Sequence, residues 1–128
     1  MMFETIDLHG FTVSDAIIRF VSRYNRLVTE RQGQGADVWG IEVIHGKGTA
    51  AQGGLIREAL RDYLKGNGKR ITGFDVQLVL RGSQADLQKY RGKCAFIHGE
   101  DIDRNAGKTL VIPMERLRRP ENLRYYNY

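Results

Sequence analysis

The sequence predicts an α/β domain in which strands and helices alternate along the chain. Short apolar runs end in a histidine followed by a glycine, and other segments carry apolar residues at intervals of three and four. With 128 residues, 41% of them hydrophobic, the chain can bury one core, so we expect a single domain over residues 1–128. The predicted core, residues 4–80, has the order β-α-β-α-β. Its crossovers favour parallel strands in a sheet covered by helices.

The chain begins with a predicted strand over residues 3–8, which closes on His9-Gly10. Thr12, with Asp15 three positions later, resembles a capping box and marks the start of a helix. The apolar positions of this helix are Val13, Ala16, Ile17, Phe20, Val21, Tyr24, Leu27 and Val28. Three arginines lie between them and should face water, with an anion-binding ridge as the alternative: Arg19, Arg23 and Arg26.

The second strand is expected at residues 38–44, with Trp39 as a packing residue near its start. A second amphipathic helix follows a glycine-rich loop, and its apolar positions are Leu55, Ile56, Ala59, Leu60, Tyr63 and Leu64. Gly66-Asn67-Gly68 should end this helix. Residues 71–80 alternate between apolar and polar types, which predicts a third strand.

The pattern is less regular after Arg81. Residues 83–90 fit a short helix or an irregular loop, and residues 93–97 and 108–112 fit two short strands. Residues 114–128 form a basic, tyrosine-rich tail that could contact bases and phosphates, or simply be a mobile or lightly docked terminus. Its cationic and aromatic residues are Arg116, Arg118, Arg119, Arg124, Tyr125, Tyr126 and Tyr128.

Charge and composition narrow the function classes. A net charge of +5 and a pI near 9.6 make nucleic acid or another polyanion a plausible partner. The single cysteine, Cys94, cannot form an internal disulfide, and no leader sequence or membrane-spanning run is evident. We therefore expect a cytoplasmic protein without membrane contact, and a monomer.

The central motif is the loop between the second strand and the second helix. The apolar run ends at His45, and Gly46-Lys47-Gly48-Thr49 follows, with Arg57 in the first turns of the helix. Glycines allow backbone N–H groups to point at a guest, and a helix N-terminus favours negative charge. The loop therefore predicts a phosphate-binding site, in which Lys47 and Arg57 neutralise charge. The alternative is a tight connection whose glycines solve a steric problem.

Each of the three histidines precedes a glycine at the end of an apolar run: His9, His45 and His98. Because the carboxyl ends of parallel strands share one edge, we expect His9 and His45 in one crevice. Asp7 projects to the same face as His9 and can orient its imidazole for proton transfer. These groups suit phosphodiester cleavage. We interpret His98 as a structural residue and not as part of the site, because an antiparallel strand would place it at the other edge of the sheet.

Other motifs fit less well. Gly46, Gly48 and Ala51 match a dinucleotide fingerprint loosely, but no acidic residue follows at the expected spacing. Gly107-Lys108-Thr109 imitates a P-loop without its first glycine. No zinc-ligand spacing is present. Asp7, His9 and His45 could hold a catalytic metal, so a divalent cofactor, Mg or Mn, stays open.

Asp7-Leu8-His9-Gly10, then His45-Gly46-Lys47-Gly48 and Gly54-Leu55-Ile56-Arg57, resembles the motif series of the Smr (small MutS-related) domain family. Gly107-x-Thr109-x-Val111 is similar to the final strand of that family, which implies an inserted segment at 81–106 before a final strand at 108–112. The resemblance implies a two-layer α/β fold similar to the C-terminal domain of translation initiation factor 3.

The resemblance also implies nucleic-acid binding and endonuclease activity on DNA or RNA. Family roles carry over to Asp7 and His9 of the first motif and to residues 45–48 of the second. Lys47 stands where relatives often have arginine, which is the better bidentate phosphate ligand. The first hypothesis is thus an Smr-type endonuclease. The alternatives are a non-catalytic module that binds nucleic acid or the ribosome, and an enzyme acting on a small phosphate compound.

Overall fold

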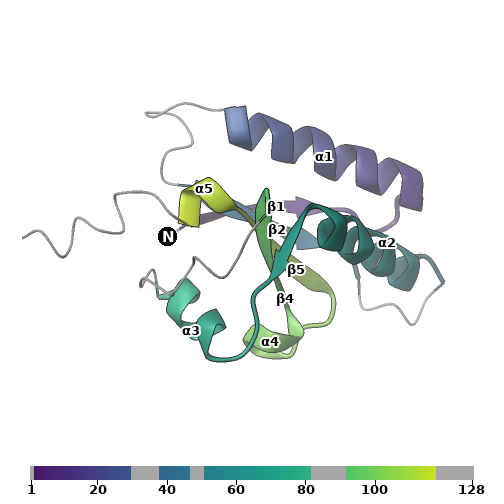
Figure 1. The fold of residues 1–128 in the computed structure, drawn as a ribbon. Coiled ribbons are helices and arrows are strands. Elements are labelled where there is room, and N and C mark those ends of the chain that lie inside the picture. The colour runs from purple at the N-terminus through teal and green to yellow at the C-terminus, as the bar shows by residue number, and fades with distance from the viewer. Residues whose placement is uncertain (1, 30–37, 47–50, 82–91, 118–128) are drawn as a thin grey trace, which may run out of the picture.

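The computed structural model describes residues 2–29, 38–46, 51–81 and 92–117, which form a five-stranded sheet with helices on both faces (Figure 1). The strands are β1 (Met2–Asp7), β2 (Val38–Ile44), β3 (Gly68–Arg70), β4 (Cys94–His98) and β5 (Lys108–Pro113). Their order across the sheet is β1-β2-β5-β4-β3. The predicted α/β class is confirmed.

Four of the five strands run in the same direction. β1 is parallel to β2 and β3 is parallel to β4, whereas β5 is antiparallel to both β2 and β4. The predicted parallel pairing of the first two strands is therefore correct, but β5 and β4 separate β2 from β3. As a result, the carboxyl ends of β1, β2, β4 and β3 share one edge of the sheet, and β5 begins there.

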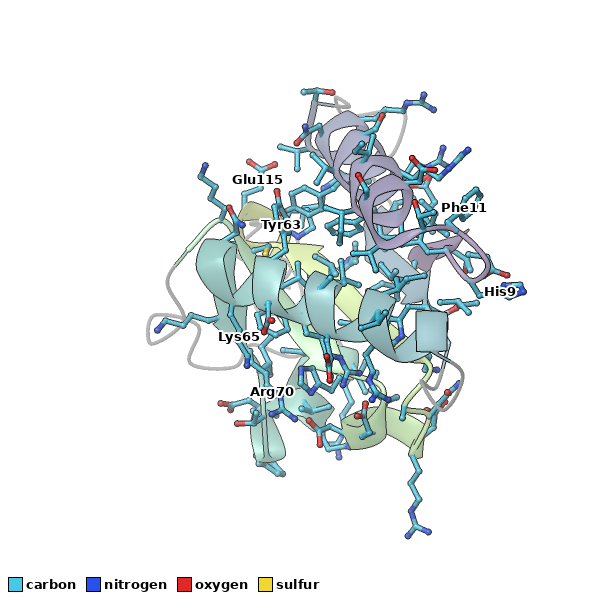
Figure 2. All side chains as sticks on the ribbon, turned by 90° about the vertical axis from the view of Figure 1, so that its right-hand side faces the viewer. His9, Phe11, Tyr63, Lys65, Arg70 and Glu115 are labelled. Atoms are coloured by element: carbon cyan, nitrogen blue, oxygen red, sulfur yellow. The ribbon has the colours of Figure 1, made fainter. Side chains whose placement is uncertain are left out.

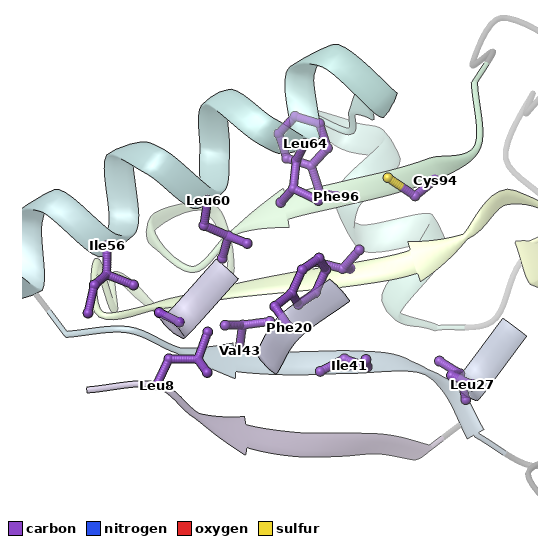
Figure 3. Close-up of a cluster of buried hydrophobic side chains, with 12 residues drawn as sticks. Leu8, Phe20, Leu27, Ile41, Val43, Ile56, Leu60, Leu64, Cys94 and Phe96 are labelled. Carbon is purple, nitrogen blue, oxygen red and sulfur yellow. The ribbon is translucent and has the colours of Figure 1, made fainter. Parts of the chain in front are cut away.

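Two long helices, α1 (Val13–Thr29) and α2 (Ala51–Asn67), cover one face of the sheet. Thr12 caps α1 as the sequence predicts, because its hydroxyl accepts the N–H of Asp15 at 3.2 Å. Apolar side chains from both helices meet those of β2, β4 and β5 in one buried cluster (Figure 3). Its members are Leu8, Ala16, Phe20, Leu27, Ile41, Val43, Ile56, Leu60, Leu64, Cys94, Phe96 and Val111.

The opposite face is also covered, by the short helices α3 (Phe74–Leu80) and α5 (Met114–Leu117). A further short helix, α4 (Glu100–Asp103), follows β4 at the carboxyl edge. The second buried cluster consists of Ile71, Val76, Val79, Ala95, Ile97, Leu110, Ile112, Met114 and Leu117, and Trp39 packs against it as expected. A two-layer description is therefore incomplete, because the second face carries a thinner layer of its own.

The strand predicted at residues 71–80 is wrong. The strand β3 ends at Arg70, and most of the predicted segment forms α3. The residues of α3 that are buried are Val76 and Val79, which are three apart, while Phe74 is 69% exposed. A spacing of three suits a helix, so the apparent alternation misled the sequence interpretation. Gly73, at φ +64°, makes the turn that separates the strand from the helix.

The segment 81–106, interpreted as an insertion, supplies β4 and α4. β4 pairs with both β5 and β3, so it is an inner strand of the sheet. Residues 83–90 lie outside the described residues, as do residues 118–128 of the predicted tail. Arg116 is buried and donates hydrogen bonds to the carbonyls of Leu27 (2.7 Å) and Val38, so it joins α5 to α1 and β2 and is not exposed to nucleic acid.

Candidate active site

All three histidine-glycine pairs lie at the carboxyl edge of the sheet. The N–H of Leu8 donates to the carbonyl of Ile44 at 2.7 Å, which keeps the ends of β1 and β2 together. His98 ends β4, which runs in the same direction as β2. The expectation that His98 sits at the opposite edge is therefore wrong, because β5 is the strand that reverses direction.

The end of β1 holds His9 against Asp7. The Oδ1 atom of Asp7 accepts the backbone N–H of His9 at 3.0 Å, and it lies 2.7 Å from the Nδ1 atom of the same residue. The first contact closes a turn typical of aspartate, and the second is in the range of charge-assisted hydrogen bonds. The expected side-by-side placement of Asp7 and His9 is thus present, formed by a turn and not by a continuing strand.

This arrangement determines the protonation of Asp7 and the position of the proton on the ring of His9. The hydrogen bond from His9 is the main cause that lowers the pKa of Asp7 below its usual 3.8, so Asp7 is a carboxylate at neutral pH. A carboxylate only accepts, which places a proton on Nδ1 of His9 and leaves Nε2 as the ring atom for a guest. The side chain of His9 is 72% exposed and projects away from the body of the protein (Figure 2). Its imidazole is therefore oriented and accessible.

His45 has the opposite environment. Its side chain is fully buried, its Nδ1 atom lies 3.0 Å from the carbonyl of Gly46, and its Nε2 atom lies 2.9 Å from the hydroxyl of Thr109. A carbonyl only accepts, so Nδ1 carries the proton and Nε2 accepts from Thr109. Burial is the main cause that lowers the pKa of His45 to about 4, which keeps the ring neutral at pH 7.

The two imidazoles therefore differ in their access to a substrate. His9 faces solvent, whereas both nitrogens of His45 are engaged inside the protein. The expectation that His45 takes part in catalysis stays a prediction, and in this structure its side chain is buried with both ring nitrogens hydrogen bonded. Its contacts tie the end of β2 to the start of β5.

The polar network around His45 was not identified in the sequence. Arg61 of α2 donates from Nε to the hydroxyl of Thr109 at 3.1 Å and holds the carboxylate of Glu100 through two nitrogens, at 2.7 and 2.9 Å. This bidentate contact is the main cause that lowers the pKa of Glu100 to about 2. Arg61 also donates to the carbonyl of Lys108 at 3.1 Å. One side chain thus joins α2, β5 and α4.

The predicted phosphate cradle is described only in part. Lys47, Gly48 and Thr49 lie outside the described residues. The N–H of Gly46 donates to the carbonyl of Gly107 at 3.1 Å, so this donor is used within the protein, and a phosphate-binding role of Gly46 stays a prediction. Gly46 has φ +91°, a conformation that favours glycine at the start of the loop. The charge of Arg57 contributes to lowering the pKa of His45, so Arg57 lies in the neighbourhood of His45.

The described residues offer no ready metal site. Asp7 and His9 supply neighbouring ligand types, but His45 cannot complete the set because both of its nitrogens are hydrogen bonded. More generally, no group of three or more histidine, cysteine, aspartate or glutamate side chains suited to a metal occurs in the described part of the chain.

Among the described residues, no helix has the length and apolar character required to cross a bilayer.

The fold and the edge geometry define a small α/β domain with an oriented Asp–His pair after its first strand and a histidine-glycine loop after its second. The sequence model of the Smr domain family matches residues 6–88, which is more than half of the chain. The protein belongs to the Smr domain family. The match includes both motifs and ends before β4, and comparisons with curated proteins and with solved structures give no match.

Proposed function

We propose that this protein is an endonuclease that nicks or cleaves phosphodiester bonds of DNA or RNA, with Asp7 and His9 as its catalytic pair. Membership of the Smr family supports nucleic-acid binding, and the net charge of +5 favours a polyanionic partner. The observation that carries the catalytic part is the exposed imidazole of His9, held by the carboxylate of Asp7 at 2.7 Å. An oriented, accessible imidazole is suited to proton transfer near neutral pH.

In the proposed reaction a water molecule attacks the phosphorus while Nε2 of His9 takes its proton. The bond between phosphorus and the leaving oxygen breaks, and that oxygen takes a proton from solvent. Asp7 keeps Nδ1 protonated and stabilises the imidazolium that forms, as a carboxylate does beside a catalytic histidine. Lys47 and Arg57 would neutralise charge on the phosphate, and Gly48 and Thr49 would present backbone donors to it.

His45 acts in this proposal as a positioning residue. Its Nδ1–H donates to the carbonyl of Gly46, the residue that begins the glycine loop, and Thr109 and Arg61 hold the ring from below. A buried network in which each polar group has a partner favours one geometry over others. His45 therefore fixes the residue from which the glycine loop starts.

The test compares nicking of plasmid DNA and cleavage of a structured RNA by the wild type, Asp7→Ala, His9→Ala and Lys47→Ala, each with and without EDTA. We expect cleavage of at least one substrate by the wild type and a loss of roughly a hundredfold or more in the His9→Ala variant. Equal cleavage by all four proteins would exclude the proposed catalytic pair. The EDTA arm decides whether a divalent ion, Mg or Mn, takes part.

The alternative is a module that binds nucleic acid or a ribosomal surface without chemistry. The family and the charge favour it as much as they favour an endonuclease, and only the Asp7–His9 pair separates the two. Salt-dependent binding by the wild type without cleavage in any metal condition would favour this second function.

A further inference from the structure

A cation–aromatic pair lies beside the proposed catalytic residues. The guanidinium carbon of Arg19 sits 4.2 Å from the centre of the Phe11 ring. Phe11 is half-buried and packs against the main core cluster, whereas Arg19 is exposed. A guanidinium over an aromatic face is attracted by the ring and loses freedom without losing its hydrogen-bond donors. Arg19 is thus a positioned surface cation.

The pair is close to His9. Phe11 follows His9 by two residues in the turn that leads into α1, where the N–H of Phe11 donates to the carbonyl of Leu8 at 3.4 Å. Two residues span at most about 7 Å of backbone. Figure 2 shows His9 and Phe11 on the same side of the molecule. A nucleic-acid strand that places a phosphate at His9 can therefore reach the Phe11 ring and Arg19 with a neighbouring phosphate.

Arg19 also differs from three other arginines of the described residues, because each of those forms an ion pair with a carboxylate. Arg23 pairs with Glu4, Arg61 with Glu100 and Arg70 with Asp101. Within the part of the chain that the structure describes, no carboxylate forms an ion pair with Arg19. Its charge is held in place by a ring and is not neutralised, which is the arrangement that suits an anionic guest.

We propose that Arg19, held by Phe11, binds the phosphate next to the one that is cleaved. This inference rests on the proposed function for its position along the substrate, but binding can be measured without cleavage. The planar guanidinium can donate two parallel hydrogen bonds to phosphate oxygens, which an ammonium cannot do with the same geometry. Phe11 lowers the cost of ordering the Arg19 side chain when it binds.

The experiment measures binding of a fluorescein-labelled RNA stem-loop, and of the DNA of the same sequence, by anisotropy at several NaCl concentrations. All proteins carry His9→Ala so that the probes stay intact. Arg19→Ala is compared with Arg26→Ala, a matched control seven residues later on the same side of α1, about 10 Å farther from His9 and without a ring partner among the described residues.

We expect Arg19→Ala to weaken binding roughly tenfold or more, because one charge-assisted hydrogen bond accounts for about tenfold and the guanidinium can donate two. The slope of log affinity against log salt should fall by about 0.7 to 0.9, as for one lost phosphate contact, and Arg26→Ala should leave it unchanged. Arg19→Lys and Phe11→Leu should weaken affinity while retaining the slope. Urea unfolding of each variant shows whether the protein is folded, so that weaker binding is not mistaken for unfolding.

Equal effects of Arg19→Ala and Arg26→Ala, or no effect of either, would overturn the inference, as would the absence of binding to both probes. Cleavage is assayed separately with the unmutated His9 protein. If that protein binds without cleaving, the endonuclease proposal fails while the comparison of the two arginines still decides the role of Arg19.

Discussion

Replacing Thr109 by valine tests the buried network that holds His45. Valine has nearly the shape of threonine, so the substitution removes the hydroxyl that donates to Nε2 of His45 and accepts from Nε of Arg61, at 2.9 and 3.1 Å. Thr109 is fully buried, so both groups would lose a partner without gaining water. Each unsatisfied buried group costs about 1–3 kcal/mol, or about 2–6 kcal/mol for two. We expect about 3 kcal/mol, in the lower half of that range, because Arg61 keeps its contacts with Glu100 and Lys108.

The assay is urea unfolding followed by circular dichroism. With a slope of about 2 kcal/mol per molar urea, the Thr109→Val midpoint should fall by about 1.5 M. Thr109→Ser is the matched control, because it keeps the hydroxyl and loses one methyl group, at a cost of about 1 kcal/mol. A Thr109→Val protein as stable as Thr109→Ser would refute the assignment of this hydroxyl to the network.

The burial of His45 predicts a pH dependence of stability. Its pKa is about 4 in the folded protein and 6.5 as a free side chain, so the unfolded chain binds a proton that the folded protein excludes, and the free energy of unfolding falls as pH drops from 6.5 to 4. His45→Gln should reduce this slope by about 1.4 kcal/mol per pH unit, and an unchanged slope would argue against a neutral, buried ring. At the start of β3, Gly68→Ala should lower the free energy of unfolding by about 1–3 kcal/mol, because a Cβ there would lie 2.0 Å from the carbonyl oxygen of Cys94. Gly66→Ala, with open space around its Cβ, should be neutral or stabilising in the same urea assay, and equal effects of the two would contradict the close approach of β3 and β4.

Local patterns predicted the first half of the fold well. The helix α1 and its Thr12 cap depend on side chains close in sequence, and the β1–β2 pair follows from the strand-helix-strand order. Residues 71–80 failed because a short apolar segment fits both a strand and a helix, and the choice was made by packing against β4 and β5. The insertion of β5 between β2 and β4 depends on pairing between distant segments, which no local pattern encodes.

In the candidate site, too, contacts between distant residues could not be predicted from the sequence. His9 and His45 look alike in the sequence, since each ends an apolar run and precedes a glycine. Asp7 is two residues from His9, so their contact could be predicted from the chain alone. The partner of His45 is Thr109, 64 residues later. Arg61, on α2, contacts both Thr109 and Glu100. Burial of His45 was therefore decided by tertiary contacts, and sequence reasoning gave both histidines one role.

Chemical rescue of the His9→Ala variant by imidazole tests most directly whether this ring transfers a proton. Because His9 is 72% exposed, imidazole from solution can reach the space that its ring occupies. We predict that cleavage of nucleic acid falls by roughly a hundredfold or more in His9→Ala and recovers in part as imidazole is added, whereas Asp7→Ala gains nothing from imidazole. Cleavage by His9→Ala at the wild-type rate without imidazole would contradict the proposed role of His9.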